Sequence, residues 1–365
     1  MRFPRPFRVL AVLLAVAGLA PRPAASIPPA PPRSVVVVSF DGAGAEELGR
    51  QRAALSPDGF LRAEREGLSA ERLQPVIPSL TAVVHVSIST GALPAATGVV
   101  SNSYWPAGSS LKSRENGFEA EPAVETIWEA LARQGRRVAS LGWPGVSGRS
   151  PRMSTPVGFR WSEPKAPGFL WSGPQPGSAF PEAAIALPPE VRSYSPPRLV
   201  RVEPPTGRDG AAAPPLVFVL VDGKDDGRRD YDALVALAPD GRLAARLGAG
   251  EWAALPDPGD GDARRGRWVK ALRLAPDGSE VSLYVGGVGQ TEAWPADFQR
   301  TLDARCGFWP GAPDARLLEG PSPDTKTFLE MADRFSAFFT AAFETTVRRG
   351  DWDLLLAYQP LVDEV

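Results

Sequence analysis

Two uninterrupted apolar runs stand far apart in the chain, one near its start and one near its end. Residues 35–38 are four consecutive valines, and residues 354–356 are three consecutive leucines. Runs without polar alternation are typical of strands that are buried on both faces of a parallel sheet. An acid follows each run, Asp41 after the first and Asp363 after the second. Because α/β sheets bind ligands beyond the carboxyl ends of their strands, both acids are candidate site residues.

Helical spacing of apolar residues appears between these runs. It predicts an amphipathic helix over residues 121–134 and a longer helix over residues 324–349, whose aromatic stripe we interpret as core packing. A strand is expected at residues 138–142, after the first helix. Strand and helix in alternation predict an α/β fold with a mainly parallel sheet flanked by helices.

The pattern between these segments changes to short apolar runs separated by turns. Residues 216–221 predict a strand, and Ala-Pro-Asp-Gly turns at 238–241 and 275–278 predict two antiparallel hairpins. Prolines and glycines break every pattern over residues 150–205, where we expect irregular structure. A short strand is expected at residues 68–74.

The amino terminus has the pattern of a secretory signal. Arg2, Arg5 and Arg8 precede an apolar stretch, residues 9–20, that is too short to cross a bilayer. We predict a signal peptide over residues 1–26, hence a secreted or periplasmic protein, with an uncleaved anchor as the alternative.

Five segments follow from these patterns. After the signal peptide we predict a proline-rich tether at 27–34, the first part of an α/β catalytic domain at 35–205, a β-rich insertion at 206–295, and a return to the α/β domain at 296–365. We expect this last part to be C-terminally incomplete.

Composition removes several classes of protein and site. The net charge of −2 gives no sign of binding to nucleic acid or to an anionic membrane surface. The single cysteine, Cys306, excludes an intrachain disulfide and a cysteine-based zinc site. His85 is the only histidine, so these 365 residues hold few of the ligands that zinc prefers.

The segment at residues 75–102 carries the candidate chemistry. Pro78 disfavours helix before Thr81, and small and apolar residues then run to Ser89, so a helix is expected to start with Ser79 or Thr81 as its cap. A helix N-terminus presents free N–H groups and the positive end of the helix dipole, which favour phosphate binding. A threonine at that point is a candidate nucleophile, although a plain cap is the simpler interpretation.

Five motifs in fixed order resemble one known family. They are Phe40-Asp41-Gly42, Thr81 with His85 four residues on, Gly98-Val99-Val100-Ser101-Asn102, Trp143-Pro144-Gly145, and Tyr358-Gln359-Pro360-Leu361-Val362-Asp363. In this combination the chain resembles the type I phosphodiesterase/nucleotide pyrophosphatase branch of the alkaline phosphatase superfamily. The chain departs from the family pattern at Val84, where many members have asparagine.

The resemblance implies a reaction and a set of site residues. It implies metal-dependent hydrolysis of phosphodiester or pyrophosphate bonds in a small phosphate-ester substrate, through a phospho-threonine intermediate on Thr81. Asp41, Thr81 and Asp363 would be metal ligands for two divalent ions, expected to be Zn²⁺. Asn102 and the backbone N–H of Thr81 would bind the phosphate. His85 on its apolar helix is interpreted as a hydrogen-bonded core residue.

The family continues past its last aspartate with further histidines. We therefore expect the natural chain to be longer and this 365-residue form to be inactive. Two alternatives stay open: a phosphomonoesterase or sulfatase-like enzyme of the same fold, and a non-catalytic extracellular binding protein. No pattern in the sequence predicts the oligomeric state.

Overall fold

A computed structural model describes residues 34–146, 157–162, 167–175, 177–206, 214–256, 265–319 and 324–365. The predicted signal peptide, and all of the predicted tether except Ser34, lie outside the described residues. Within the described part of the chain, no helix combines the length and the apolar character that a membrane crossing requires.

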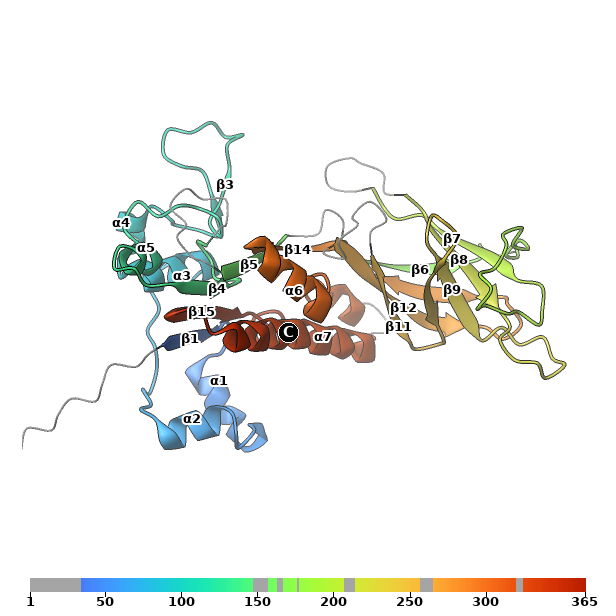
Figure 1. Ribbon diagram of the computed structural model, residues 1–365, viewed down its shortest axis with the longest axis horizontal. Helices are drawn as coiled ribbons and strands as arrows, with labels where there is room; N and C mark the ends of the chain where they lie inside the picture. The colour runs from blue at the N-terminus through green and yellow to red at the C-terminus, as the bar shows by residue number, and fades with distance from the viewer. Residues whose placement is uncertain are drawn as a thin grey trace, which may run out of the picture. The chain divides into compact units, whose positions relative to one another are not determined.

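The main sheet is large and mixed. Its strands are β1 (Val35–Phe40), β4 (Val138–Leu141), β5 (Val157–Ser162), β6 (Phe169–Gly173), β11 (Trp252–Pro256), β12 (Arg265–Leu274), β13 (Val281–Val285), β14 (Gly289–Trp294) and β15 (Leu354–Gln359). The order is β1-β15-β4-β5-β14-β12-β13-β6, with β11 paired to β12. Strands β1, β15, β4 and β5 pair in parallel, and the remaining pairs are antiparallel. The α/β fold is confirmed, with antiparallel strands extending its parallel part (Figure 1).

Two smaller sheets and a set of helices complete the described structure. The smaller sheets contain β2 (Ser103–Tyr104) and β3 (Glu115–Asn116), and β7 (Arg198–Val202), β8 (Leu216–Val221), β9 (Ala233–Leu237) and β10 (Leu243–Leu247). The helices are α1 (Ala45–Arg50), η1 (Arg52–Ala54), α2 (Phe60–Glu66), α3 (Thr81–Thr90), α4 (Pro94–Thr97), α5 (Ile127–Ala132), α6 (Ala296–Cys306), η2 (Ala315–Leu318) and α7 (Thr325–Arg349).

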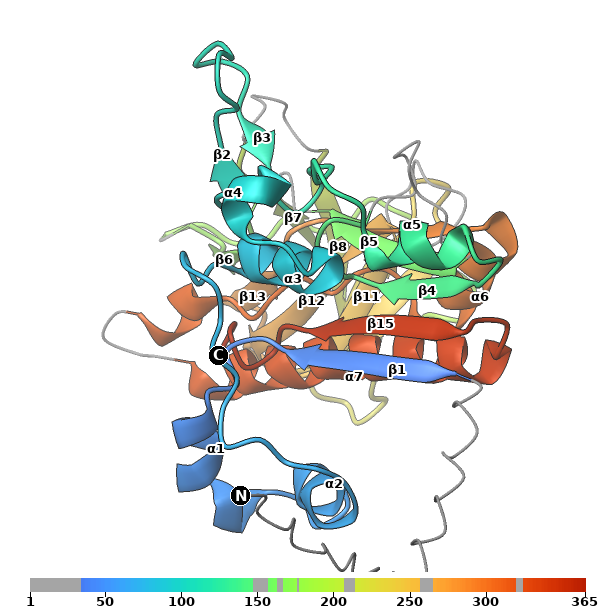
Figure 2. The same ribbon diagram turned by 90° about the vertical axis from the view of Figure 1, so that its left-hand side faces the viewer.

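Strand β15 is buried on both of its faces, as its apolar run predicts. Leu355 and Ala357 belong to the core that α6 and α7 form with the sheet. Leu354 and Leu356 point to the opposite face and pack in a cluster with Trp128 of α5. Successive side chains of a strand alternate between faces, so a continuous apolar run feeds both cores. Figure 2 shows α7 and α5 on opposite sides of β15.

Strand β1 differs from that expectation. It is the edge strand, with β15 as its neighbour, and Val35, Val36 and Val38 keep 40–45% of their surface exposed. The prediction that residues 35–38 are buried on both faces is therefore wrong. Valine content indicates a strand, but burial depends on which elements pack against it.

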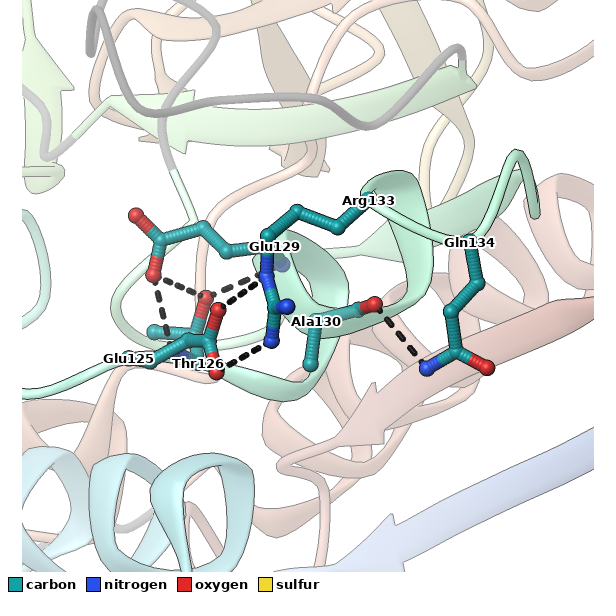
Figure 3. Close-up of polar contacts among 6 residues, drawn as sticks. All are labelled: Glu125, Thr126, Glu129, Ala130, Arg133 and Gln134. Carbon is teal, nitrogen blue, oxygen red and sulfur yellow. Dashed lines mark hydrogen bonds and ion pairs between the residues drawn. The ribbon is translucent and has the colours of Figure 1, made fainter.

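Helix α5 is shorter than predicted because a capping box sets its start. The Thr126 hydroxyl accepts from the Glu129 N–H at 3.4 Å, and the Glu129 carboxylate accepts from the Thr126 N–H at 2.8 Å (Figure 3). The two residues thus satisfy backbone groups that have no partner within the helix. Arg133, which follows the last residue of α5, forms a bidentate ion pair with Glu125, the residue before the N-cap.

The turn motifs predict local pairing correctly. The turn at 238–241 joins the antiparallel strands β9 and β10, and the turn at 275–278 joins β12 and β13. The expectation of irregular structure over residues 150–205 is wrong where β5, β6 and β7 form, and no strand forms at residues 68–74. The limits of the predicted insertion at 206 and 295 stay predictions.

A charged network ties α7 to strands β11 and β12. Lys270 is 3% exposed, and its ammonium lies 2.6 Å from a carboxylate oxygen of Glu330 on α7. The same carboxylate accepts the indole N–H of Trp252 at 2.7 Å. Burial opposes ionisation of Glu330, but the bonds from Lys270 and Trp252 outweigh it and leave its pKa lowered.

Replacing Glu330 with glutamine is expected to destabilise the protein in a pH-dependent way. A lowered native pKa means that the carboxylate stabilises the fold above its unfolded pKa, and that this contribution is lost as pH falls through the native pKa. We expect a loss of about 1–2 kcal/mol at pH 7, because Glu330 is partly exposed, and a smaller loss near pH 3. Urea unfolding at both pH values measures this difference. Glu344→Gln, which breaks an exposed pair on the same helix, is the control. An equal loss at both pH values would contradict the role of ionised Glu330.

Candidate active site

The N-terminus of α3 is open at the point where Thr81 begins the helix. The residue before it, Leu80, has extended backbone and gives no side-chain cap. The prediction that Ser79 or Thr81 caps the helix is therefore wrong, although the predicted start at Thr81 is correct. Because the N-cap residue uses none of the first N–H groups of the helix, these groups can donate to other side chains or to an anion.

Asn102 is oriented by this same helix end. Its side-chain oxygen accepts the N–H of Ala82 at 2.9 Å. A carboxamide that uses its oxygen in this way has its NH₂ group left to donate elsewhere. Thr81 and Asn102 both line one cavity. The structure thus brings together the two residues that the sequence proposed for phosphate contacts.

Asp41 and Asp363 meet at the carboxyl ends of β1 and β15. The two strands are parallel neighbours, so the residues that follow them come to one edge of the sheet. A Cβ atom on Gly42 would lie 2.8 Å from the Cα of Asp363, and Gly42 has φ of 71°, so glycine permits both the turn and the close approach. The two acids predicted from opposite ends of the chain are therefore neighbours.

Burial and nearby negative charge shift the pKa values of two ionisable groups at this edge of the sheet. Partial burial, with Asp41 adding to it, raises the pKa of Asp363 above the ordinary value. Tyr358 donates its hydroxyl to Asp41 at 2.8 Å, and burial together with Asp41 raises the pKa of the tyrosine. Tyr358 therefore stays protonated and holds Asp41 in place.

His85 is engaged within the protein. One ring nitrogen, Nδ1, lies 2.7 Å from the Thr81 carbonyl, which can only accept, so Nδ1 carries the proton. Nε2 lies 2.8 Å from the Ser39 hydroxyl, which then donates to it. Burial lowers the pKa of His85, in keeping with a neutral ring. The interpretation of His85 as a hydrogen-bonded core residue is confirmed, and the ring ties the first turn of α3 to β1.

A cavity of about 870 Å³ is lined by three of the four candidate residues. Thr81, Asn102 and Asp363 line it, together with Trp143 and Tyr358. Asp41 does not line it but is joined to it through the hydroxyl of Tyr358. The sequence analysis missed Tyr358 as a site residue, although it stands in the same motif as Asp363.

The same cavity is lined by a loop that the sequence analysis also missed. Residues 309–314 and Arg316 all face it, next to Phe335 of α7. The sequence could have indicated this loop, because proline and glycine are frequent in residues 309–313, directly after a helix-forming stretch.

The donor set fits a divalent cation in type but does not complete a two-metal site. Asp41, Asp363 and the Thr81 hydroxyl supply oxygen atoms, and oxygen is an accepted ligand of zinc. Among the described residues, however, no group of three or more histidine, cysteine, aspartate or glutamate side chains converges on a point. His85 has both nitrogens occupied. The two zinc ions implied by the resemblance therefore lack a full set of ligands in this part of the chain.

Comparison with known families gives one match. Residues 35–177 match the family model described as type I phosphodiesterase / nucleotide pyrophosphatase. The matched segment contains Asp41, Thr81 and Asn102, while Asp363 lies beyond it. A search of curated proteins found no match.

Proposed function

We propose that this chain, whose residues 35–177 match the type I phosphodiesterase/nucleotide pyrophosphatase family of the alkaline phosphatase superfamily, hydrolyses a small phosphate ester through a phospho-threonine intermediate. The match to this family supports phosphodiester or pyrophosphate hydrolysis. One observation carries the finer proposal: Thr81, the first residue of α3, lines a cavity together with Asn102, whose side chain accepts the N–H of the next residue, Ala82.

In this proposal Thr81 Oγ1 attacks the phosphorus atom. The bond from Thr81 to phosphorus forms as the bond to the departing alcohol breaks, and the alcohol leaves with a proton. Water then attacks the phospho-threonine, releasing a phosphomonoester and restoring the hydroxyl. The N–H of Thr81 at the start of α3 and the Asn102 NH₂ group would donate to the phosphate oxygens, where negative charge increases in the transition state.

We also propose that a divalent cation, expected to be Zn²⁺, assists this site, with Asp41 and Asp363 among its ligands. When bound, such a cation supplies Lewis-acid stabilisation of oxygen charge. The 365-residue chain is expected to bind zinc weakly and to turn over slowly, because His85 is its only histidine and is already engaged.

The direct test is hydrolysis of bis(p-nitrophenyl) phosphate in the presence of Zn²⁺. The protein is assayed on this diester, with p-nitrophenyl phosphate as the monoester comparison. Faster release of nitrophenolate from the diester supports the proposal. Preference for the monoester would favour a phosphomonoesterase, and no cleavage of either compound would refute hydrolysis.

The incomplete donor set favours one alternative, a non-catalytic protein that binds a phosphate ester in the same cavity. Binding of thymidine 5′-monophosphate without cleavage of any diester would identify that case. We further propose a secreted or periplasmic location, supported by the signal-peptide pattern of residues 1–26.

Replacing Asn102 is expected to separate its donor role from its structural role. Asn102→Ala should lower kcat/KM for the diester by roughly a hundredfold, the usual cost of one donor to a developing oxyanion. Asn102→Asp keeps an oxygen that accepts the Ala82 N–H but loses the NH₂ donor and adds negative charge. It should fold normally and lose at least as much activity. If the aspartate variant kept wild-type activity, the amide would not donate to the phosphate.

A further inference from the structure

The cavity wall carries two cationic side chains among the described residues that line it, Arg160 of β5 and Arg316 of η2. The remaining wall near them comes from β13, through Tyr284, and from the loop at 309–314. A free guanidinium at such a place would be a binding site for a further phosphate group of a substrate. The state of these two groups therefore bears on which phosphate esters the cavity accepts.

Arg160 is already held by two carboxylates. Its Nε and Nη2 donate to one oxygen of Glu292 at 3.0 and 2.7 Å, and its Nη1 pairs with Glu119. The Arg160 side chain is 14% exposed, so little of it is open to another anion. This cluster of one cation and two acids has a net negative charge.

Arg316 is held in a forked pair with Asp314. Its Nε donates to one carboxylate oxygen at 2.8 Å and its Nη2 donates to the other at 2.6 Å. Nη2 also donates to the Gly168 carbonyl at 2.6 Å, and the Tyr284 hydroxyl donates to Asp314 at 3.2 Å. The pair is neutral, and its donors on the Nε–Nη2 edge are used.

Part of the cavity wall is aromatic. It includes side chains from five different segments: Phe118, Trp143, Tyr284, Trp309 and Phe335. At about 870 Å³ the cavity is large enough to enclose organic groups attached to a phosphate. Aromatic faces beside guanidinium groups that are already paired suit uncharged organic groups, whereas a second phosphate would lose hydration without gaining an unpaired cation among the described residues that line the cavity.

We infer that this cavity selects phosphodiesters with uncharged organic groups over substrates with pyrophosphate bonds, because Arg160 and Arg316 are neutralised by acids of the protein itself. The inference rests on the proposed hydrolytic function and specifies its substrate class. It identifies Asp314 and Glu119 as specificity determinants, since each withholds a guanidinium from the substrate.

Two substrates that share the thymidylyl group test the inference. Thymidine 5′-(p-nitrophenyl phosphate) carries an uncharged nitrophenyl group and releases p-nitrophenolate, and thymidine 5′-triphosphate releases pyrophosphate, while both yield thymidine 5′-monophosphate. The protein is expected to show kcat/KM at least about tenfold higher for the nitrophenyl diester, which corresponds to the loss of one favourable charge pair.

The variant Asp314→Asn frees Arg316 while leaving a side chain that caps η2 and fits the same space. We expect it to raise kcat/KM for the triphosphate by roughly three- to tenfold and to lower the inhibition constant of inorganic pyrophosphate by a similar factor. Glu119→Gln, which weakens the hold on Arg160, should act in the same direction. Asp240→Asn is the matched control, because Asp240 and Arg242 form the same kind of pair two residues apart outside the cavity.

The outcomes distinguish this inference from the proposed function. If the wild-type protein cleaves the triphosphate as well as the nitrophenyl diester, the inference is overturned and hydrolysis stands. If neither compound is cleaved, both fall. An Asp314→Asn variant that folds, as judged by circular dichroism, yet binds pyrophosphate no tighter than wild type also overturns the inference.

Discussion

Replacing Thr81 with alanine is expected to lower kcat for diester hydrolysis by at least about a thousandfold, the scale of loss seen when a nucleophile is removed. Alanine lacks Oγ1, which is the only side-chain atom of Thr81 that can form a bond to phosphorus. The helix should be unaffected, since alanine is a good helix former and Thr81 is half-buried at the first position of α3. Nitrophenolate release under saturating substrate measures the effect.

Thr81→Ser is the matched control for this nucleophile. Serine keeps a hydroxyl at the start of α3, so it should retain measurable turnover, and a phosphorylated residue should be detectable by mass spectrometry after rapid acid quench. Undiminished hydrolysis by the alanine variant would show that another group attacks the phosphate.

Truncating Phe335 to alanine is expected to lower the free energy of unfolding by about 3–5 kcal/mol, the usual cost of emptying a buried aromatic site. Phe335 is 1% exposed, and its ring lies 4.8 Å from that of Trp309 and 5.4 Å from that of Phe339. Denaturant unfolding measures the loss. Because Phe335 and Trp309 also line the cavity, weaker binding of thymidine 5′-monophosphate should accompany it.

Leu329→Ala is the control on the same helix. Leu329 is 54% exposed, so its truncation should cost less than about 0.5 kcal/mol. A similar loss for both variants would mean that helix propensity, and not core packing, accounts for the effect of Phe335→Ala.

Local signals in the sequence were sufficient for several elements and for the candidate residues. The aromatic stripe predicted α7 over nearly its full length, because helical spacing and the following glycine act within the segment itself. The turn motifs at 238–241 and 275–278 likewise predicted the hairpins of β9–β10 and β12–β13. The motif order predicted a family whose model matches residues 35–177.

Burial and capping were less predictable because they depend on distant partners. Val35, Val36 and Val38 of β1 are exposed at the sheet edge, although their sequence resembles that of β15, where Leu354 to Tyr358 are buried. The open start of α3 at Leu80 could not be inferred from the hydroxyls around it, because a capping bond depends on backbone geometry as well as on residue type.

The sequence by itself determined the residues that carry the proposed chemistry, Thr81, Asn102, Asp41 and Asp363, since residue type and order are enough to state a motif. Only the tertiary structure decided that β1 and β15 are parallel neighbours, which brings the two acids together beside Gly42. Only the tertiary structure decided that Arg160 and Arg316 reach the same cavity already paired with acids. The physical reason is that a charge acts over a few ångströms of space, and chain folding alone sets which groups come within that distance.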